Sequence, residues 1–121
     1  LDWELCTLGD PLADLGYLLN WWYRADEVDL GDDDDAPTAV AGFPSRDDLI
    51  SYYAENSGRD VSRINYYRAL SYWRLAAIYQ GVYKRYVEGV MGDKGSSGDL
   101  FITQFKERVL RLSRLALDKL K

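Results

Sequence analysis

The chain has 121 residues, 47% hydrophobic and 14% aromatic, which is enough apolar material for one domain, or part of one, with its own core. It has no His and a single Cys, which excludes histidine-based catalysis, His-rich zinc sites, an intrachain disulfide and a CxxC pair. A single Cys fits a reducing, cytoplasmic location. The sequence contains neither an apolar run long enough to span a membrane nor a signal-peptide pattern, so no membrane partner is expected.

The formal charge of −5 is unevenly distributed. Residues 1–60 carry 15 acidic and 3 basic side chains (net −12), whereas residues 61–121 carry 12 basic and 5 acidic ones (net +7). We expect the two halves to screen each other, and a basic surface for phosphates or an anionic partner is the alternative. A net acidic chain is a poor candidate for binding nucleic acid.

The first helix is predicted over residues 9–24. Asp10 is a typical N-cap, and Pro11 suits the first helical position because its missing N–H is not needed there. Leu18 and Trp21 widen the apolar stripe, so we expect this helix to be buried on most sides. The stripe itself consists of Leu12, Leu15, Leu19 and Trp22.

Residues 25–44 lose all periodicity and are predicted to form a long acidic surface loop. The four consecutive Asp at residues 32–35 repel one another and favour solvation. They lack the alternating ligands and the Gly of an EF-hand loop, so a solvated segment is favoured over a metal site.

Two more helices are predicted over residues 45–58 and 60–89. Ser45 and Asp48 form a capping-box pattern, Gly58 suits the end of the first of these helices, and Asp60 is expected to cap the second. The long helix carries apolar residues on more than one side, so several of its faces are expected to be buried. Its main stripe is Ile64, Tyr67, Ser71, Leu75, Ile78, Val82 and Tyr86, and its other faces carry Tyr66, Leu70, Trp73 and Ala77.

A Gly/Ser-rich loop is predicted over residues 90–98, followed by a helix over 99–121 that Asp99 caps. This last helix has a basic side, which can lie on a membrane or in a partner's groove but more often only faces water. Its apolar stripe is Phe101, Phe105, Val109, Leu112 and Ala116, and its basic side is Lys106, Arg108, Arg111, Arg114 and Lys119. The predicted fold class is therefore all-α, with about four helices.

Chemistry-bearing patterns are confined to the opening residues. The sequence has no GxxxxGK[ST] loop and no GxGxxG motif. Asp2 stands between apolar residues, where a carboxylate needs a cation or hydrogen-bond donors. Mg²⁺ is the obvious cation, but the other ligands must come from outside this sequence. Because the chain opens on Leu1 directly before Asp2, we expect a further segment upstream.

Leu1-Asp2-Trp3-Glu4, Gly9-Asp10-Pro11 and Asp14-Leu15 resemble the pattern that closes the active site of aminoglycoside-phosphotransferase-like kinases. Residues 45–62 and 64–86 are similar to the kinase-like domains found alone in actinobacteria and fused to some acyl-CoA dehydrogenases. The resemblance covers essentially the whole chain. It implies the C-terminal helical part of the larger lobe of a protein-kinase-like α+β fold.

The resemblance also implies roles for single residues. Residues 1–8 would end a metal-binding strand or loop, in which Asp2 holds Mg²⁺ against the phosphates of ATP. Asp14 would steady the catalytic loop through hydrogen bonds to its backbone, or else simply face water. The parent enzyme would transfer the γ-phosphate of ATP to a hydroxyl group of a small-molecule substrate.

The catalytic loop and the strand-rich N-terminal lobe of such a kinase are absent from the sequence, which has no His for the loop's motif. We therefore predict that the isolated chain has no kinase activity and that its exposed apolar surface favours self-association. A non-catalytic helical scaffold, with the acidic loop and the basic last helix as docking surfaces, is the alternative function.

Five residues on the helices are candidates for the substrate pocket, although a core role is the alternative for each aromatic: Trp21, Trp22, Tyr67, Trp73 and Arg74. Arg74 also belongs to a series with Arg63 and Arg85, spaced by eleven residues, which is about three helical turns. These three arginines share a face that could meet an anionic substrate. We favour a role in balancing the acidic first half.

Overall fold

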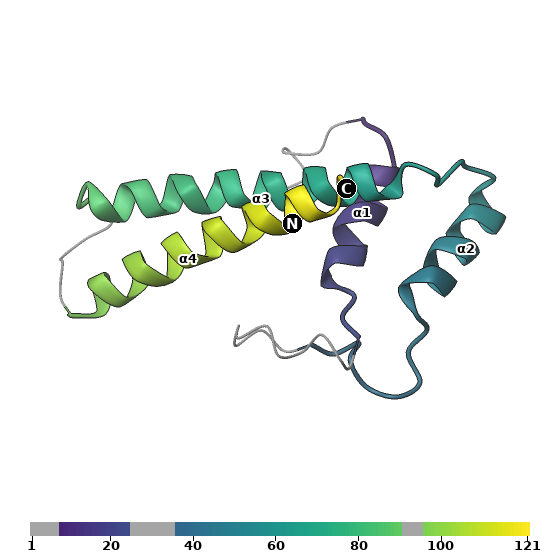
Figure 1. Ribbon diagram of the computed structural model, residues 1–121, viewed down its shortest axis with the longest axis horizontal. Coiled ribbons are helices and arrows are strands. Elements are labelled where there is room, and N and C mark those ends of the chain that lie inside the picture. Colours follow the sequence, from purple (N-terminus) through teal and green to yellow (C-terminus); the bar gives the residue numbers. More distant parts are fainter. Residues whose placement is uncertain (1–7, 25–35, 91–95) are drawn as a thin grey trace. The chain divides into compact units, whose positions relative to one another are not determined.

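The computed structural model describes residues 8–24, 36–90 and 96–121, the first four of the last range by their backbone alone. Four helices fill these ranges (Figure 1): α1 (Leu12–Trp21), α2 (Arg46–Ser57), α3 (Ile64–Val87) and α4 (Ser96–Asp118). Within the described ranges there is no β-strand, which confirms the prediction of an all-α chain with four helices. None of these helices is apolar over a length that could cross a membrane.

The chain divides into two compact units, residues 1–67 and 68–121. The first unit contains α1, α2 and the first turn of α3, and the second contains the rest of α3 and α4.

Helix α1 is shorter than the predicted range 9–24 at both ends. The Asp10 carboxylate accepts a hydrogen bond from the Leu12 amide at 3.0 Å and so satisfies a free donor of the first turn. At the other end Trp22 leaves the helical conformation, with φ −89° and ψ 84°. Its indole N–H donates to the Pro44 carbonyl at 2.9 Å, and its ring meets Phe43 edge-on at 5.6 Å. These contacts end the helix before the predicted boundary.

Helix α2 has the two ends that its sequence predicts. The Ser45 hydroxyl accepts from the Asp48 amide at 3.1 Å, while the Asp48 carboxylate accepts from the Ser45 amide at 2.9 Å. This is a complete capping box. Gly58 ends the helix in the left-handed region, with φ 67°, and its amide donates to the Ala54 carbonyl at 2.9 Å. No residue of α2 is fully buried.

The core of the first unit is built on one face of α1. Its buried members are Leu12, Leu15, Leu19 and Ile64, and the half-buried side chains packed against them are Leu49, Ile50, Tyr53, Val61 and Tyr67. The prediction that α1 is buried on most sides was wrong, because Tyr17 is 48% exposed and Leu18 is 44% exposed. The elements around α1 bury only some of its apolar side chains, and the others stay exposed.

Helix α3 begins later than predicted. The Asp60 carboxylate accepts from the Ser62 amide at 2.8 Å and from its hydroxyl at 3.0 Å, so Asp60 caps a turn that precedes the helix rather than α3 itself. The expectation that several faces of α3 are buried was also wrong, since Trp73 is 61% exposed and Ile78 59% exposed.

Helix α4 begins at Ser96, three residues before the predicted start at Asp99. The second unit is held by rings between α3 and α4, with the Phe105 centroid 5.7 Å from both Tyr79 and Tyr86. Arg108, predicted on the basic solvent side of α4, is half-buried, with its guanidinium 5.3 Å from the Tyr79 ring centre. Phe105 is half-buried, as the predicted stripe requires.

Candidate functional site

The predicted metal and ATP ligand, Asp2, lies outside the described residues, as do Cys6 and the acidic run 32–35. The role of Asp2 in binding Mg²⁺ and ATP therefore stays a prediction. Among the residues that the structure describes, no three acidic, Cys or His side chains gather closely enough to hold a metal ion. The described part of the chain offers no metal centre of its own.

A polar cluster marks the start of α1 and joins it to the first turn of α3. The Tyr67 hydroxyl donates to the Asp10 carboxylate at 2.5 Å, while the other oxygen of Asp10 accepts from the Leu12 amide. These two hydrogen bonds, aided by the positive charge of Arg59, hold the pKa of Asp10 below its usual value. The same bond to Asp10 raises the pKa of Tyr67, because it favours the protonated phenol. Tyr67 thus anchors α1, a structural role that competes with its predicted place in a substrate pocket.

This cluster predicts a pH dependence of stability. A carboxylate whose pKa is lower in the folded chain stabilises it above the unfolded pKa of about 3.9, and that contribution is lost as the pH falls through the folded value. Since Asp10 is exposed, the effect is expected to be small. Urea unfolding between pH 7 and pH 2 should show a shallower acid-side loss of stability for Asp10→Asn than for the parent chain. An identical slope for both proteins contradicts this expectation.

Asp14 lies in the first turn of α1, exposed to solvent. It has no hydrogen bond or ion pair to another side chain among the described residues. Its carboxylate is therefore free to accept hydrogen bonds from a neighbouring backbone. Its predicted support of a catalytic loop stays a prediction.

The candidate pocket residues of the first unit lie at separate places along α1. Trp21 and Trp22 stand at the end of α1, whereas Tyr67 contacts its start, and a ten-residue helix is about 15 Å long. Trp73 and Arg74 lie exposed on the α3 segment of the second unit. Within the first unit, Trp21 and Trp22 take part in local packing, such as the Trp21 ring 6.1 Å from Tyr17 and the Trp22 ring 5.6 Å from Phe43. The place of the five residues in a substrate pocket stays a prediction.

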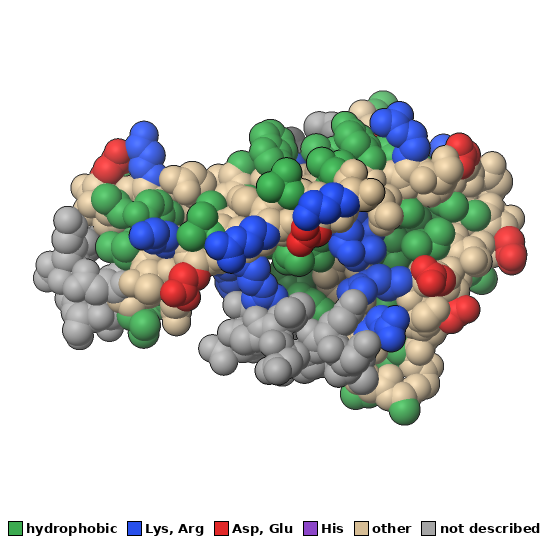
Figure 2. Space-filling model, viewed as in Figure 1, with side chains coloured by type: hydrophobic (Ala, Val, Ile, Leu, Met, Phe, Trp, Pro, Cys, Tyr) green, Lys and Arg blue, Asp and Glu red, His purple; other side chains and the backbone are tan. Residues whose placement is uncertain are grey.

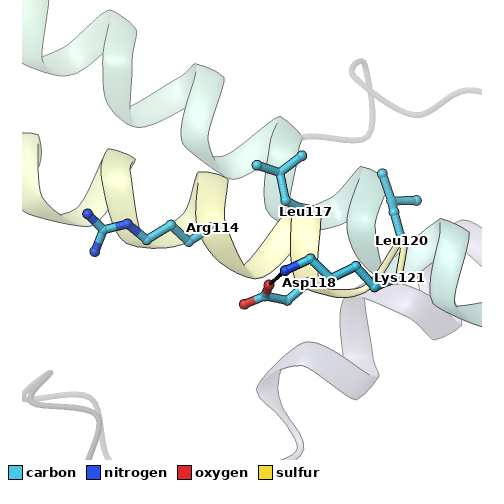
Figure 3. Close-up of a pocket in the computed structure, with 5 residues that line it drawn as sticks. All are labelled: Arg114, Leu117, Asp118, Leu120 and Lys121. Atoms are coloured by element: carbon cyan, nitrogen blue, oxygen red, sulfur yellow. Dashed lines mark hydrogen bonds and ion pairs between the residues drawn. The ribbon is translucent and has the colours of Figure 1, made fainter.

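A hollow that the sequence analysis did not identify lies at the C-terminal end of α4 (Figure 3). It has a volume of about 510 Å³, and its residues are Arg114, Leu117, Asp118, Leu120 and Lys121. The Lys121 ammonium pairs with the Asp118 carboxylate at 2.8 Å across it, and both side chains are exposed. The spacing of Leu110 and Leu117, on a side of the helix away from the predicted stripe, was the available signal for this surface.

The chain is similar to segments of much longer proteins. It is 36% identical over 121 residues to "Acyl-CoA dehydrogenase family member 11" of Mus musculus, an alignment that covers 98% of this chain and 15% of the mouse protein. The human protein of the same name is 38% identical over 84% of this chain. "Acyl-CoA dehydrogenase family member 10" of Mus musculus is 40% identical over 74% of the chain and 8% of that protein. The chain thus spans about 15% of the length of the first relatives it matches.

No protein-family model matches the sequence, and no solved structure matches it. The names of these relatives contain acyl-CoA dehydrogenase and nothing of a kinase, so the assignment to the aminoglycoside-phosphotransferase-like kinases is corrected. That assignment depended on the motif at residues 1–15, of which the first seven lie outside the described residues, and on the likeness of residues 45–62 and 64–86 to kinase-like domains. The helices of this chain add little evidence for any one family, because helical arrangements of this kind occur in many unrelated proteins.

Proposed function

We propose that this chain is a helical, non-catalytic part of a larger enzyme related to the acyl-CoA dehydrogenase family members. The observation that carries the proposal is an alignment along 98% of the chain that occupies only 15% of the mouse relative. A segment of that size supplies structure, positioning or contacts to a longer polypeptide. A cytoplasmic location, predicted from the single Cys, belongs to the same proposal.

Two features of the described residues support a non-catalytic role. They hold no group of three metal-ligating side chains, and in the first unit Trp21 and Trp22 stand at the opposite end of α1 from Tyr67. Large hydrophobic side chains are also exposed on all four helices, among them Leu18, Tyr52, Trp73 and Leu117. Apolar surface of this extent is typical of a segment that contacts another protein surface.

The test compares the isolated 121 residues with the native polypeptide that contains them. Each is assayed for acyl-CoA-dependent reduction of an electron-accepting dye. We expect activity in the longer polypeptide and none in the isolated chain. Dye reduction by the isolated chain, or a native polypeptide that is inactive on every acyl-CoA tried, contradicts the proposal.

A second candidate is phosphoryl transfer from ATP to a small-molecule hydroxyl by the longer polypeptide. The observation that favours it is the exposed Asp14 carboxylate in the first turn of α1, which has no side-chain partner in the described part of the chain and suits the support of a neighbouring loop. The residues described in the structure do not form a magnesium site, so Mg²⁺ would depend on Asp2 and on ligands from elsewhere in the polypeptide.

For this candidate, the longer polypeptide is incubated with radiolabelled ATP, Mg²⁺ and a panel of hydroxylated acids. Transfer of label that disappears in Asp2→Ala and persists in Asp47→Ala, an exposed acid of α2, supports phosphoryl transfer. Equal activity of Asp2→Ala and the parent protein removes Asp2 as a metal ligand. The isolated chain is expected to transfer no label.

A further inference from the structure

One face of α4 combines apolar side chains with positive charge although it faces solvent. Leu110, Arg114 and Leu117 follow one another at intervals of four and three residues, so they share one side of α4, and Lys121 follows just after the end of the helix at Asp118. Together with Leu120 at the edge, they are called the outer strip. Leu110, Leu117 and Leu120 are 50%, 63% and 60% exposed.

The inner side of α4 is already occupied, which makes the outer strip a separate surface. Phe105 packs against Tyr79 and Tyr86, and Ala116 is buried. Leu117 and Leu120 instead line the hollow at the end of the helix (Figure 3), and both are more than half exposed. An amphipathic helix normally has one apolar side, and α4 has a second.

The charge around the outer strip favours an acidic partner. Arg114 has no ion pair or hydrogen bond within the described residues, and neither has Lys106 one turn before Leu110. Lys121 is paired with Asp118, and Glu107, three residues before Leu110, is an exposed acid on the same side. Arg114 and Lys106 together outweigh Glu107, so the net uncompensated charge along this side of α4 is positive. Figure 2 shows Lys and Arg side chains interspersed with hydrophobic ones along this helix.

The size of the outer strip favours a partner within the same polypeptide. Three partly exposed leucines form a patch on the order of 300 Å², whereas a stable complex of separate proteins buries about 800 Å² on each side. A weak contact becomes populated when both surfaces belong to one chain, because the effective concentration reaches the millimolar range. A second copy of this chain lacks that advantage.

We infer that the outer strip is the docking surface for an acidic, apolar-faced helix that lies elsewhere in the larger polypeptide. The inference rests on the proposed function, since it requires the chain to be part of a longer protein. The three leucines bury their side chains against the apolar face of that helix, and Arg114 pairs with one of its carboxylates. The contact fixes the position of α4 relative to the rest of the enzyme.

Hydrogen exchange measured by mass spectrometry tests the docking in the native longer polypeptide. Amides of residues 110–120 are expected to exchange about tenfold more slowly there than in the isolated chain, which corresponds to about 1.4 kcal/mol. Leu117→Asp and Arg114→Glu should abolish the added protection, whereas Arg114→Lys should retain it. Leu18→Asp, a change at an exposed leucine of α1, is the matched control and should leave it intact.

Three outcomes overturn the inference. The first is equal exchange of residues 110–120 in both proteins. The second is protection that depends on protein concentration, which indicates docking of a second copy. The third is protection that survives Leu117→Asp. Each can occur while the longer polypeptide keeps its acyl-CoA-dependent activity, so failure of the docking is distinguishable from failure of the proposed function.

Discussion

Replacing Leu19 with Ala is expected to lower the free energy of unfolding by about 2–5 kcal/mol. Leu19 has no solvent exposure and lies at the centre of the first unit's core, together with Leu15 and Ile64. Truncation removes its transfer free energy and leaves a cavity that the surrounding side chains fill only in part. Because a whole domain is stable by only about 5–15 kcal/mol, this change threatens the folding of the unit.

Urea unfolding followed by circular dichroism measures the loss. The neighbouring Leu18 is 44% exposed, so Leu18→Ala provides a matched control with an expected cost below about 1 kcal/mol. The comparison depends on the difference between adjacent leucines of one helix. Equal losses for both variants would show that Leu19 is not the centre of this core.

Replacing Phe105 with Ala is expected to destabilise the second unit by about 2–5 kcal/mol. A fully buried Phe→Ala change costs about 3–5 kcal/mol, and Phe105 is half-buried. The ring also gives up its contacts with Tyr79 and Tyr86, each at 5.7 Å, which add about 0.5–1.5 kcal/mol per pair beyond burial. The contact between α3 and α4 depends on this ring more than on any other in the described part of α4.

Hydrogen exchange of the α4 amides reports this loss locally. Phe105→Ala should accelerate their exchange by at least about tenfold. The control is Phe101→Ala, since Phe101 is 46% exposed and has one ring contact, with Tyr86 at 6.0 Å. An α4 that exchanges equally fast in both variants means that Phe105 has no special role in the second unit.

Capping residues in the sequence predicted the helix ends correctly where no contact with a distant part of the chain also determines the end. The ends of α2 were placed within one residue, because Ser45, Asp48 and Gly58 satisfy backbone groups of their own helix. The end of α1 was missed because Trp22 is drawn out of the helix by Pro44, which lies far along the chain. The start of α4 was missed because Gly and Ser were interpreted as a loop, although Ser96 is already helical.

Periodicity predicted which side of each helix is apolar but not how much of it is covered. Leu19 and Trp73 both belong to apolar positions of their helices, yet one is fully buried and the other 61% exposed. Coverage depends on the elements that surround a helix, which no single window of sequence contains. The predicted chemistry has the same limit, since Asp2 needs ligands that this sequence does not supply.

The capped ends of α2 have a consequence for how its sequence can vary. Because none of its residues is fully buried, the helix depends on the capping box at Ser45 and on the left-handed Gly58 as well as on the packing of Leu49, Ile50 and Tyr53 against the core. Outward positions such as Tyr52, 66% exposed, should accept almost any helix-forming residue over evolutionary time. Ser45, Asp48 and Gly58 should instead change little, so among the solvent-exposed positions of this segment mutational tolerance should be lowest at its borders.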